Sequence, residues 1–189
     1  MSKQDKEKWD KKFSTLSELL SPRPPSNMVE KFYGKSPNKE ALDVACGGGR
    51  HTLFLSQRGY FVDGVDISSV ALKELEKKVD KEKVTLIEAD LDSFIPTKEY
   101  GFIVMSNFLD RDLIKKLQNF LLKDGIFVVE TYMDDKENQK RDYNADFLLR
   151  KGELLEMFEG FEVLEYIEFW NESYERYRMK KQAIVVKKC

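Results

Sequence analysis

A run of three glycines, Gly47–Gly49, is the feature of this sequence with the clearest chemical use. It follows an apolar run, 41–45, and precedes a helical pattern that starts near Arg50. Glycine lacks a Cβ, so such a loop can adopt positive φ angles and bring its main chain close to a ligand. The free N–H groups at the start of the following helix point to the same place. Taken alone, the run fits a ligand-binding loop and a tight strand-to-helix turn equally well.

Two aspartates further along the chain decide between these interpretations. Asp66 ends the second apolar run, about 20 residues past the loop, where a carboxylate can accept hydrogen bonds from both hydroxyls of a ribose. Asp90 ends the third run, where it is placed to accept from the exocyclic amine of an adenine. Each acid by itself is more commonly a helix cap than a ligand. The loop and both acids, in this order, predict a nucleoside-binding site beyond the carboxyl ends of parallel strands.

The nearest alternative is a nicotinamide dinucleotide site. Its Gly-x-Gly-x-x-Gly fingerprint would begin at Gly47, but the third glycine position holds Thr52. In that fingerprint the third glycine allows helix and strand to pack closely beside a pyrophosphate. Thr52 therefore disfavours dinucleotide binding.

Composition limits the classes of protein and partner. The chain has 189 residues, 41% of them hydrophobic and 35% charged, and a formal net charge of −2. This length suits a single domain. Nucleic-acid binding needs a concentrated excess of Lys and Arg, which is absent here, so we expect no nucleic-acid partner.

The cysteines, the single histidine and the apolar runs argue against a metal-binding, membrane-spanning or secreted protein. Cys46 and Cys189 lie far apart, and His51 is the single histidine, so we expect no metal site. No apolar run approaches the roughly 20 residues of a membrane span, and the charged start of the chain does not resemble a signal peptide. We therefore expect a cytoplasmic protein without a membrane partner. The oligomeric state does not follow from the sequence.

The first part of the chain predicts a helical cap. Residues 4–20 form an amphipathic pattern whose apolar stripe includes Trp9, Phe13 and Leu16. Prolines end this helix, and a short second helix is expected near 27–32. We interpret residues 1–38 as a cap over a ligand cleft, with core packing alone as an equal alternative.

Residues 39–189 predict one α/β domain with a doubly wound, mostly parallel sheet of seven strands. Strands that alternate with helices imply right-handed crossovers and a parallel sheet covered on both faces. A polar stretch follows residue 131, and the last two strands have no helix between them, so the sheet is expected to end in an antiparallel hairpin. The expected strands are 41–45, 60–65, 84–88, 100–106, 126–131, 161–168 and 176–186, and the expected helices are 50–58, 68–79, 109–122 and 151–158.

The segment Leu42–His51, followed by Gly64–Ser68, closely resembles class I S-adenosylmethionine (SAM)-dependent methyltransferases. Within this class the chain is most similar to the small bacterial tellurite-resistance-like group, and the similarity extends through 107–109, 130–132 and 147–154. The resemblance implies a Rossmann-like methyltransferase fold, SAM as the cofactor and methyltransferase activity. These motifs are specific for SAM binding and carry little information about the methyl acceptor.

The resemblance also implies roles for particular residues. The glycines would lie against the methionine part of SAM, and the acid before them would orient the loop and reach the amino group through water. The acids after the second and third strands would hold the ribose and the adenine, and the end of the fourth strand would lie near the sulfonium. The implied cofactor-binding residues are Asp43, Ala45, Cys46, Gly47, Gly49, Asp66, Ile67, Asp90, Leu91, Ser106 and Asn107.

Catalytic residues are less well specified. SAM carries an activated methyl group, so a protein can catalyse its transfer largely by positioning, which supplies about 7–11 kcal/mol in well-oriented systems. His51, the single histidine, is the candidate for a base, and Glu130 and Tyr132 are candidates for a catalytic role on the substrate side. The alternatives are a helix residue near the cofactor for His51 and a strand-end polar cluster without a chemical role for the other two. Arg111 is interpreted either as a binder of an anionic substrate or, preferably, as a salt-bridge partner.

Two functions follow as hypotheses. The first is a SAM-dependent methyltransferase that acts by in-line displacement on a small-molecule acceptor such as a thiol or a chalcogen oxyanion. The second is a SAM-binding sensor or partner subunit without catalysis. In the first, the N-terminal helix and the loop 132–146 are predicted to form a lid that excludes water.

Overall fold

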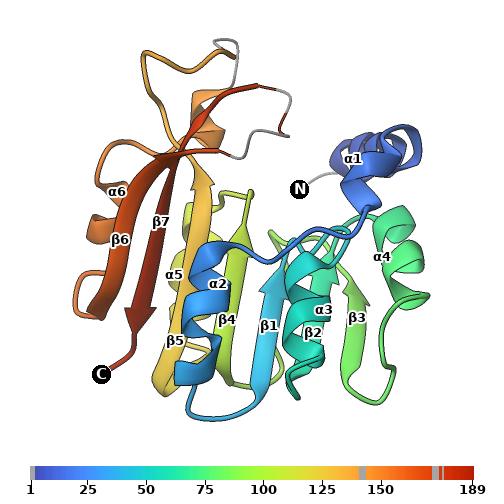
Figure 1. Cartoon of the computed structure of the whole chain (residues 1–189), viewed down its shortest axis with the longest axis horizontal. Helices are drawn as coiled ribbons and strands as arrows, with labels where there is room; N and C mark the ends of the chain where they lie inside the picture. Colours follow the sequence, from blue (N-terminus) through green and yellow to red (C-terminus); the bar gives the residue numbers. More distant parts are fainter. Residues whose placement is uncertain (1–2, 141–143, 172–174, 176) are drawn as a thin grey trace.

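A computed structural model describes residues 3–140, 144–171, 175 and 177–189. These residues form one sheet of seven strands in the order β3-β2-β1-β4-β5-β7-β6 (Figure 1). The strands are β1 (Glu40–Val44), β2 (Phe61–Asp66), β3 (Val84–Glu88), β4 (Tyr100–Ser106), β5 (Leu121–Tyr132), β6 (Glu162–Trp170) and β7 (Lys180–Lys187).

Strands β1 to β5 are parallel, and β7 runs antiparallel to both of its neighbours, β5 and β6. This arrangement confirms the predicted α/β fold with an antiparallel end. Residue 176, at the start of the predicted last strand, lies outside the described residues. The strand order reverses at β1, whose neighbours are β2 and β4. Ligands of open α/β sheets bind beyond the carboxyl ends of the strands at such a reversal.

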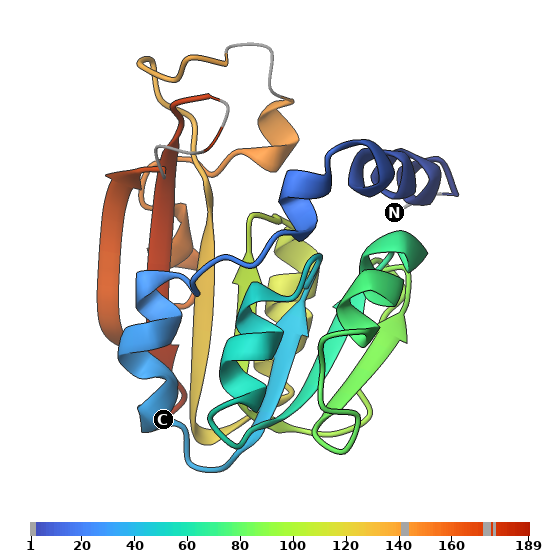
Figure 2. The same ribbon diagram turned by 45° about the vertical axis from the view of Figure 1, so that its right-hand side comes forward.

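Helices cover both faces of the sheet. Apolar side chains of α2 and α3 pack with alternate residues of β1, β2, β4, β5 and β7 on one face, and α4 lies beside α3. Those of α5 and α6 pack against the other residues of the same strands (Figures 1 and 2). The helices are α2 (Asn27–Phe32), α3 (Arg50–Ser56), α4 (Ser69–Glu76), α5 (Arg111–Gln118) and α6 (Glu153–Met157).

The N-terminal segment differs from the single helix expected over 4–20. It forms α1 (Lys3–Thr15) and a separate 3₁₀ turn, η1 (Ser17–Leu20). Leu16 between them leaves the helical region, with φ −117° and ψ 75°. The Thr15 hydroxyl donates to a carbonyl one turn earlier (2.8 Å), an interaction that competes with the helical ladder. The break turns η1 toward the sheet.

The helix expected over 109–122 also ends early. α5 ends at Gln118, and β5 already begins at Leu121, which is fully buried. A turn then follows inside β5, with Asp124 at φ 59°. The apolar residue at 121 fits both periodicities, and only its pairing with Tyr100 in the sheet makes it part of a strand.

Arg111 acts as a structural ion-pair partner. Its guanidinium donates to both carboxylate oxygens of the buried Glu153 (2.6 and 3.2 Å) and to the carbonyls of Asp146 and Leu148 (2.7 and 3.0 Å). These contacts join the start of α5 to the start of α6 and to residues 146–148, which lie between β5 and α6. The structure therefore supports the salt-bridge interpretation of Arg111.

Candidate functional site

The glycine loop has the backbone that its sequence predicts. Gly47 and Gly49 have φ angles of 51° and 79°, and Ala45 shares this left-handed region at 55°. A Cβ on Gly49 would overlap the side chain of Leu75, so this position requires glycine for space as well as for conformation. The loop lies between β1 and the start of α3, at the reversal of strand order.

Asp66 joins this loop to the end of β2. Its carboxylate accepts the N–H of Gly47 (2.8 Å) through one oxygen and the N–H of Ser68 (2.8 Å) through the other. Burial raises the pKa of Asp66, and these backbone hydrogen bonds oppose the rise. The loop and the first predicted acid therefore form one unit.

The second predicted acid lies one strand further along. Asp90 follows β3 and is half-buried, and its carboxylate accepts the N–H of Asp92 (3.0 Å). The neighbouring predicted residues Ile67 and Leu91 are buried. The carboxyl ends of β2 and β3 thus hold both acids at the same edge of the sheet as the loop.

Asp43 anchors the loop from the interior of the protein. One carboxylate oxygen accepts both the N–H (2.9 Å) and the hydroxyl (2.7 Å) of Thr52. Thr52 is the residue that breaks the dinucleotide fingerprint, and its hydroxyl tethers α3 to β1. Burial is the largest influence on Asp43 and raises its pKa to about 6. Asp43 therefore supports the loop from the interior.

His51 lies below the loop and is nearly fully buried, with 3% exposure. Its Nε2 accepts the backbone N–H of Ser26 (3.2 Å), so this lone pair is already used. Burial, followed by the charges of Arg50 and Lys181, holds the pKa of His51 well below its usual value. The neutral, occupied imidazole supports the interpretation of His51 as a helix residue that fixes the N-terminal segment.

A polar cluster lies where β4, β5 and β7 end. Arg50 donates to the hydroxyl of Ser106 (2.9 Å), and the carboxylate of Glu130 lies 3.7 Å from Arg50 and 3.8 Å from Lys181. Lys181 is 2% exposed and pairs with Glu175 at 2.8 Å. Buried charges of opposite sign thus lie together beside the glycine loop.

Tyr132 and Asn107 complete this end of the sheet. The Tyr132 hydroxyl donates to Glu175, and the Tyr132 ring lies 4.9 Å from the ammonium of Lys181. Asn107 has a φ of 58°, and its N–H donates to the carbonyl of Glu130 (2.8 Å). The strained turn at Asn107 lies directly after Ser106, the last residue of β4.

The N-terminal segment covers the loop. A Cβ placed on Gly47 would lie 3.3 Å from the ring of Phe13, and one on Gly48 would lie 2.8 Å from the carbonyl oxygen of Leu19. Phe13 is 8% exposed. α1 and η1 therefore contact the two glycines directly, beyond the carboxyl ends of the central strands (Figure 2).

Polar contacts hold α1 in this position. Asp10 accepts the hydroxyl of Ser68 (2.6 Å) and the N–H of Val70 (3.2 Å) at the start of α4. Lys6 pairs with Glu88 (2.7 Å) at the end of β3. Carboxylates are favoured at helix N-termini, which explains the position of Asp10.

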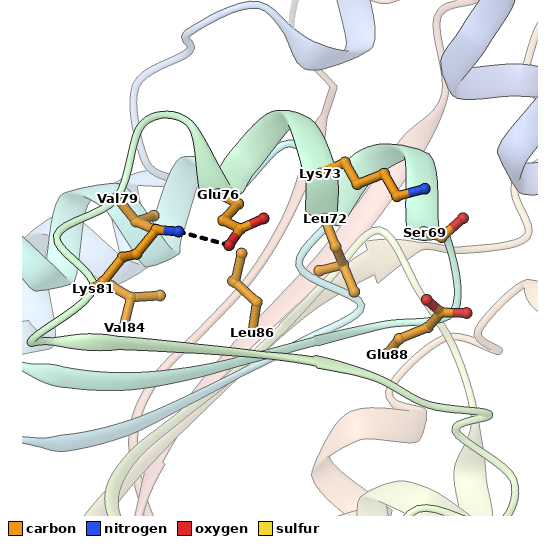
Figure 3. Close-up of a pocket in the computed structure, with 9 residues that line it drawn as sticks. All are labelled: Ser69, Leu72, Lys73, Glu76, Val79, Lys81, Val84, Leu86 and Glu88. Atoms are coloured by element: carbon orange, nitrogen blue, oxygen red, sulfur yellow. Dashed lines mark hydrogen bonds and ion pairs between the residues drawn. The ribbon is translucent and has the colours of Figure 1, made fainter.

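A separate groove of about 330 Å³ lies between α4 and β3. Figure 3 shows apolar side chains such as Leu72 and Leu86 at its floor and an ion pair between Glu76 and Lys81 at its rim. None of the residues predicted to bind the cofactor lines this groove. Within the described residues, no helix is long and apolar enough to cross a membrane, and no cluster of metal-ligating side chains occurs.

Comparison with known proteins identifies the family. The sequence profile described as "Tellurite resistance protein TehB" matches residues 4–182. The chain belongs to the TehB family. This confirms the resemblance predicted from the glycine loop and the acids.

Individual members of the TehB family and other methyltransferases agree with this assignment. The probable SAM-dependent methyltransferase TehB of Haemophilus influenzae (strain 10810) is 28% identical over 168 residues, which cover 81% of this chain and 58% of that protein. The crystal structure of TehB from Haemophilus influenzae superposes with a TM-score of 0.78 at 23% identity, over 96% of this chain and 67% of that chain. The glycopeptide N-methyltransferase MtfA, solved with S-adenosyl-L-homocysteine (SAH), has a TM-score of 0.64 at 18% identity, over 95% and 97% of the two chains.

The chain spans about half the length of the curated relatives that it matches, 48% and 58% for two of them. At identities of 23% and 18%, the solved structures establish a shared fold.

Three charged residues of the candidate site are absent from the set predicted to bind the cofactor. Arg50 stands next to the glycine run, and this adjacency is a signal that points to it. Lys181 lies inside a strand and next to another lysine, so the sequence does not reveal which of the two is buried. Asp10 lies among many charged residues of an exposed helix, and only its contact with α4 distinguishes it.

The buried carboxyl of Asp43 predicts a pH-dependent stability. Because burial favours its protonated form, its contribution to stability is present in full below the unfolded pKa near 3.8 and is lost as the pH rises through about 6. We expect the free energy of unfolding of the wild type, relative to Asp43→Asn, to fall by up to about 3 kcal/mol across this range. Denaturant unfolding at several pH values measures this. Asp112→Asn, on an exposed residue of α5, is the control, and a difference that is independent of pH would contradict the assignment.

Proposed function

We propose that this TehB-family chain is a SAM-dependent methyltransferase that acts on a small-molecule acceptor such as a thiol or a chalcogen oxyanion. The observation that carries the proposal is the unit formed by the glycine loop and Asp66 at the reversal of strand order. A main chain that is open to close approach, next to a carboxylate at the end of β2, suits a nucleoside with an attached amino acid. The names of the matched relatives support the same chemistry.

The residues present fit this cofactor. Gly47 and Gly49 lack side chains where the main chain would meet the methionine part, and Asp66 and Asp90 offer carboxylate oxygens to the ribose hydroxyls and the adenine amine. The remaining predicted contacts, including Ser106 and Asn107, lie along the same edge of the sheet.

Arg50 adds a cation to this set. Its guanidinium has five N–H donors, and among the described residues one hydrogen bond, to Ser106, engages it. We propose that the others hold the carboxylate of the methionine part, since bidentate Arg–carboxylate pairs are strong and directional.

Bound SAM supplies a methyl group on a sulfonium whose leaving group is a neutral thioether. The task of the protein is then to align an acceptor with the methyl carbon and to exclude water. Ser106, Asn107 and Glu130 border the space in which we place the acceptor. Asp43 and His51 fix the loop and the N-terminal segment from the interior.

The cofactor assignment is tested by Asp66→Ala. Loss of the two hydroxyl contacts, each a charge-assisted hydrogen bond worth about 1.5 kcal/mol or more, should weaken SAH binding about 100-fold or more in calorimetry. Glu159→Ala, on an exposed residue after α6, should bind like the wild type. A thermal melt confirms that the variant is folded. Binding of NAD in place of SAH by the wild type would refute the assignment.

Catalysis is distinguished from a sensor or partner role by turnover. The enzyme hypothesis predicts SAH production from SAM with at least one member of a panel of thiols, phenols, selenite and tellurite. Tight SAM binding without turnover on any of them would favour a non-catalytic SAM-binding protein. Asp66→Ala serves as the negative control for background hydrolysis of SAM.

We further propose that residues 1–38 act as a cap that closes over the cofactor. Phe13 and Leu19 cover the two glycines, and Asp10 and Lys6 attach α1 to α4 and β3. The loop 132–146 is proposed to complete this lid; residues 141–143 of it lie outside the described residues.

The cap is tested by Phe13→Ala. Removal of the ring that covers Gly47 takes away roughly 2 kcal/mol of apolar burial and should speed SAH dissociation by at least about tenfold. Lys11→Ala, on the exposed side of α1, should leave the rate unchanged. Stopped-flow fluorescence of the protein during displacement of SAH measures the rate. Equal dissociation rates for wild type and Phe13→Ala would exclude a lid role for α1.

A further inference from the structure

Strand β3 forms an open edge of the sheet. Among the described strands its single neighbour is β2. The carbonyl of Lys83 accepts the N–H of Val62 (2.8 Å) at one end of this pair, and the N–H of Ala89 donates to β2 (3.1 Å) at the other end. Successive residues of a strand direct their N–H and C=O groups to opposite sides, so Leu86 and Glu88 direct theirs away from β2. Such an edge is a template for another strand.

The groove between α4 and β3 runs along this edge (Figure 3). Leu72 and Leu86 contribute to its apolar floor. Lys81 lies at the end of the groove where β3 begins, and Glu88 lies at the end where β3 finishes. A strand that paired with β3 would cover the main-chain groups of the edge and this apolar floor together.

The two ends of the groove carry side chains of opposite charge. Lys81 pairs with Glu76 (2.7 Å), and Glu88 pairs with Lys6 (2.7 Å). The side chains of Lys81 and Glu88 are 71% and 50% exposed, and ion pairs as exposed as these contribute little to stability and leave both charges accessible. A two-fold axis at Leu86 brings the basic end of one copy against the acidic end of another. The edge is therefore complementary to itself in charge.

Antiparallel pairing about Leu86 also matches the other side chains. Leu86 meets Leu86 of the second copy, and the exposed Thr85 meets the half-buried Ile87. Cross-strand pairs of apolar and β-branched residues stabilise a sheet. The N–H of Val84 is already bonded within the chain (2.9 Å), so the main-chain donors available to the new pair are those of Leu86 and Glu88.

The other edge of the described sheet, β6, is less suited to such pairing. It has a bulge between Val163 and Glu165, and bulges protect edges from further strands. Its charged residues are Glu162, Glu165 and Glu168, and the strand contains no lysine or arginine. Two-fold pairing of β6 would therefore bring carboxylates together without an opposite charge from the strand itself.

We propose that β3 pairs antiparallel with β3 of a second copy of this chain, so that two sheets join into one across a two-fold axis at Leu86. Lys81 of each copy then faces Glu88 of the other. A second copy fits this edge because symmetry supplies the matching charge at both ends and the matching leucine at the centre. None of the residues predicted to bind the cofactor lines the groove, so this interface lies outside the proposed SAM site.

Sedimentation equilibrium of the full chain at rising protein concentration tests the interface. The wild type should form dimers, and Glu88→Lys should raise the dissociation constant at least about tenfold, because it places two lysines opposite each other. The charge swap Lys81→Glu/Glu88→Lys should restore association. A wild type that stays monomeric would overturn the proposal, and so would a swap that fails to restore a dimer lost in Glu88→Lys.

Two controls separate this interface from other effects of the substitution. Lys6→Ala removes the ion pair of Glu88 with α1 and keeps the carboxylate, so it should leave association unchanged. Glu162→Lys makes the same charge reversal on the other edge strand and should also have no effect. Dissociation caused by either control to the same extent as by Glu88→Lys would contradict the assignment to β3.

Amide hydrogen exchange gives a second readout that identifies the paired strand. The N–H groups of Leu86 and Glu88 should become protected as the protein concentration rises, whereas the N–H of Val84 should be protected at every concentration. Dimers that form without added protection at Leu86 and Glu88 would show that association uses another surface.

Discussion

The carboxylate of Asp66 makes the contact on which the rest of the site depends. It accepts one N–H from the glycine loop after β1 and one from the segment that leads into α4, so it joins the ends of two parallel strands. The loop has positive φ angles at Ala45, Gly47 and Gly49 and cannot be held by regular secondary structure. A charged acceptor that bonds two backbone donors at once replaces the missing ladder. Asp43 performs the corresponding task on the interior side through Thr52.

The N-terminal helix α1 is attached to the same unit. Asp66 positions Ser68, the N-cap of α4, and Asp10 of α1 accepts the hydroxyl of that serine. The attachment of α1 therefore depends on the geometry that shapes the glycine loop. Phe13 and Leu19 then reach the glycines themselves, where only residues without a side chain leave room for them. The glycine loop, Asp66 and α1 are thus joined by a continuous set of contacts.

The charged cluster at the ends of β4, β5 and β7 is stabilised by pairing between side chains of opposite charge. Arg50, Glu130 and Lys181 come from three separate elements and are nearly buried together. Burial of unpaired charges is strongly unfavourable, and two carboxylates, Glu130 and Glu175, accompany the two cations here. The opposite charges balance one another, so this end of the sheet is polar and carries little net charge.

The sequence by itself determined the elements whose signals are local. Apolar runs with strand length located the strands, glycines and acids at strand ends indicated a candidate site, and two strands without an intervening helix predicted the antiparallel end. These signals depend on backbone conformation and on periodicity, both of which can be read from a short window. Thr52, at the third glycine position, also disfavoured the dinucleotide pattern from sequence alone, although its tether to Asp43 was not foreseen.

Only the tertiary structure decided which charged residues are buried and what they contact. Arg50, Lys181 and Asp10 resemble many exposed neighbours in the sequence, and burial became evident only when β7 paired with β5 and α1 packed on α4. The break at Leu16 and the strand start at Leu121 likewise depend on distant partners. Long-range packing overrides local periodicity wherever a residue suits two conformations equally well, and the choice between them is made by contacts between segments far apart in the chain.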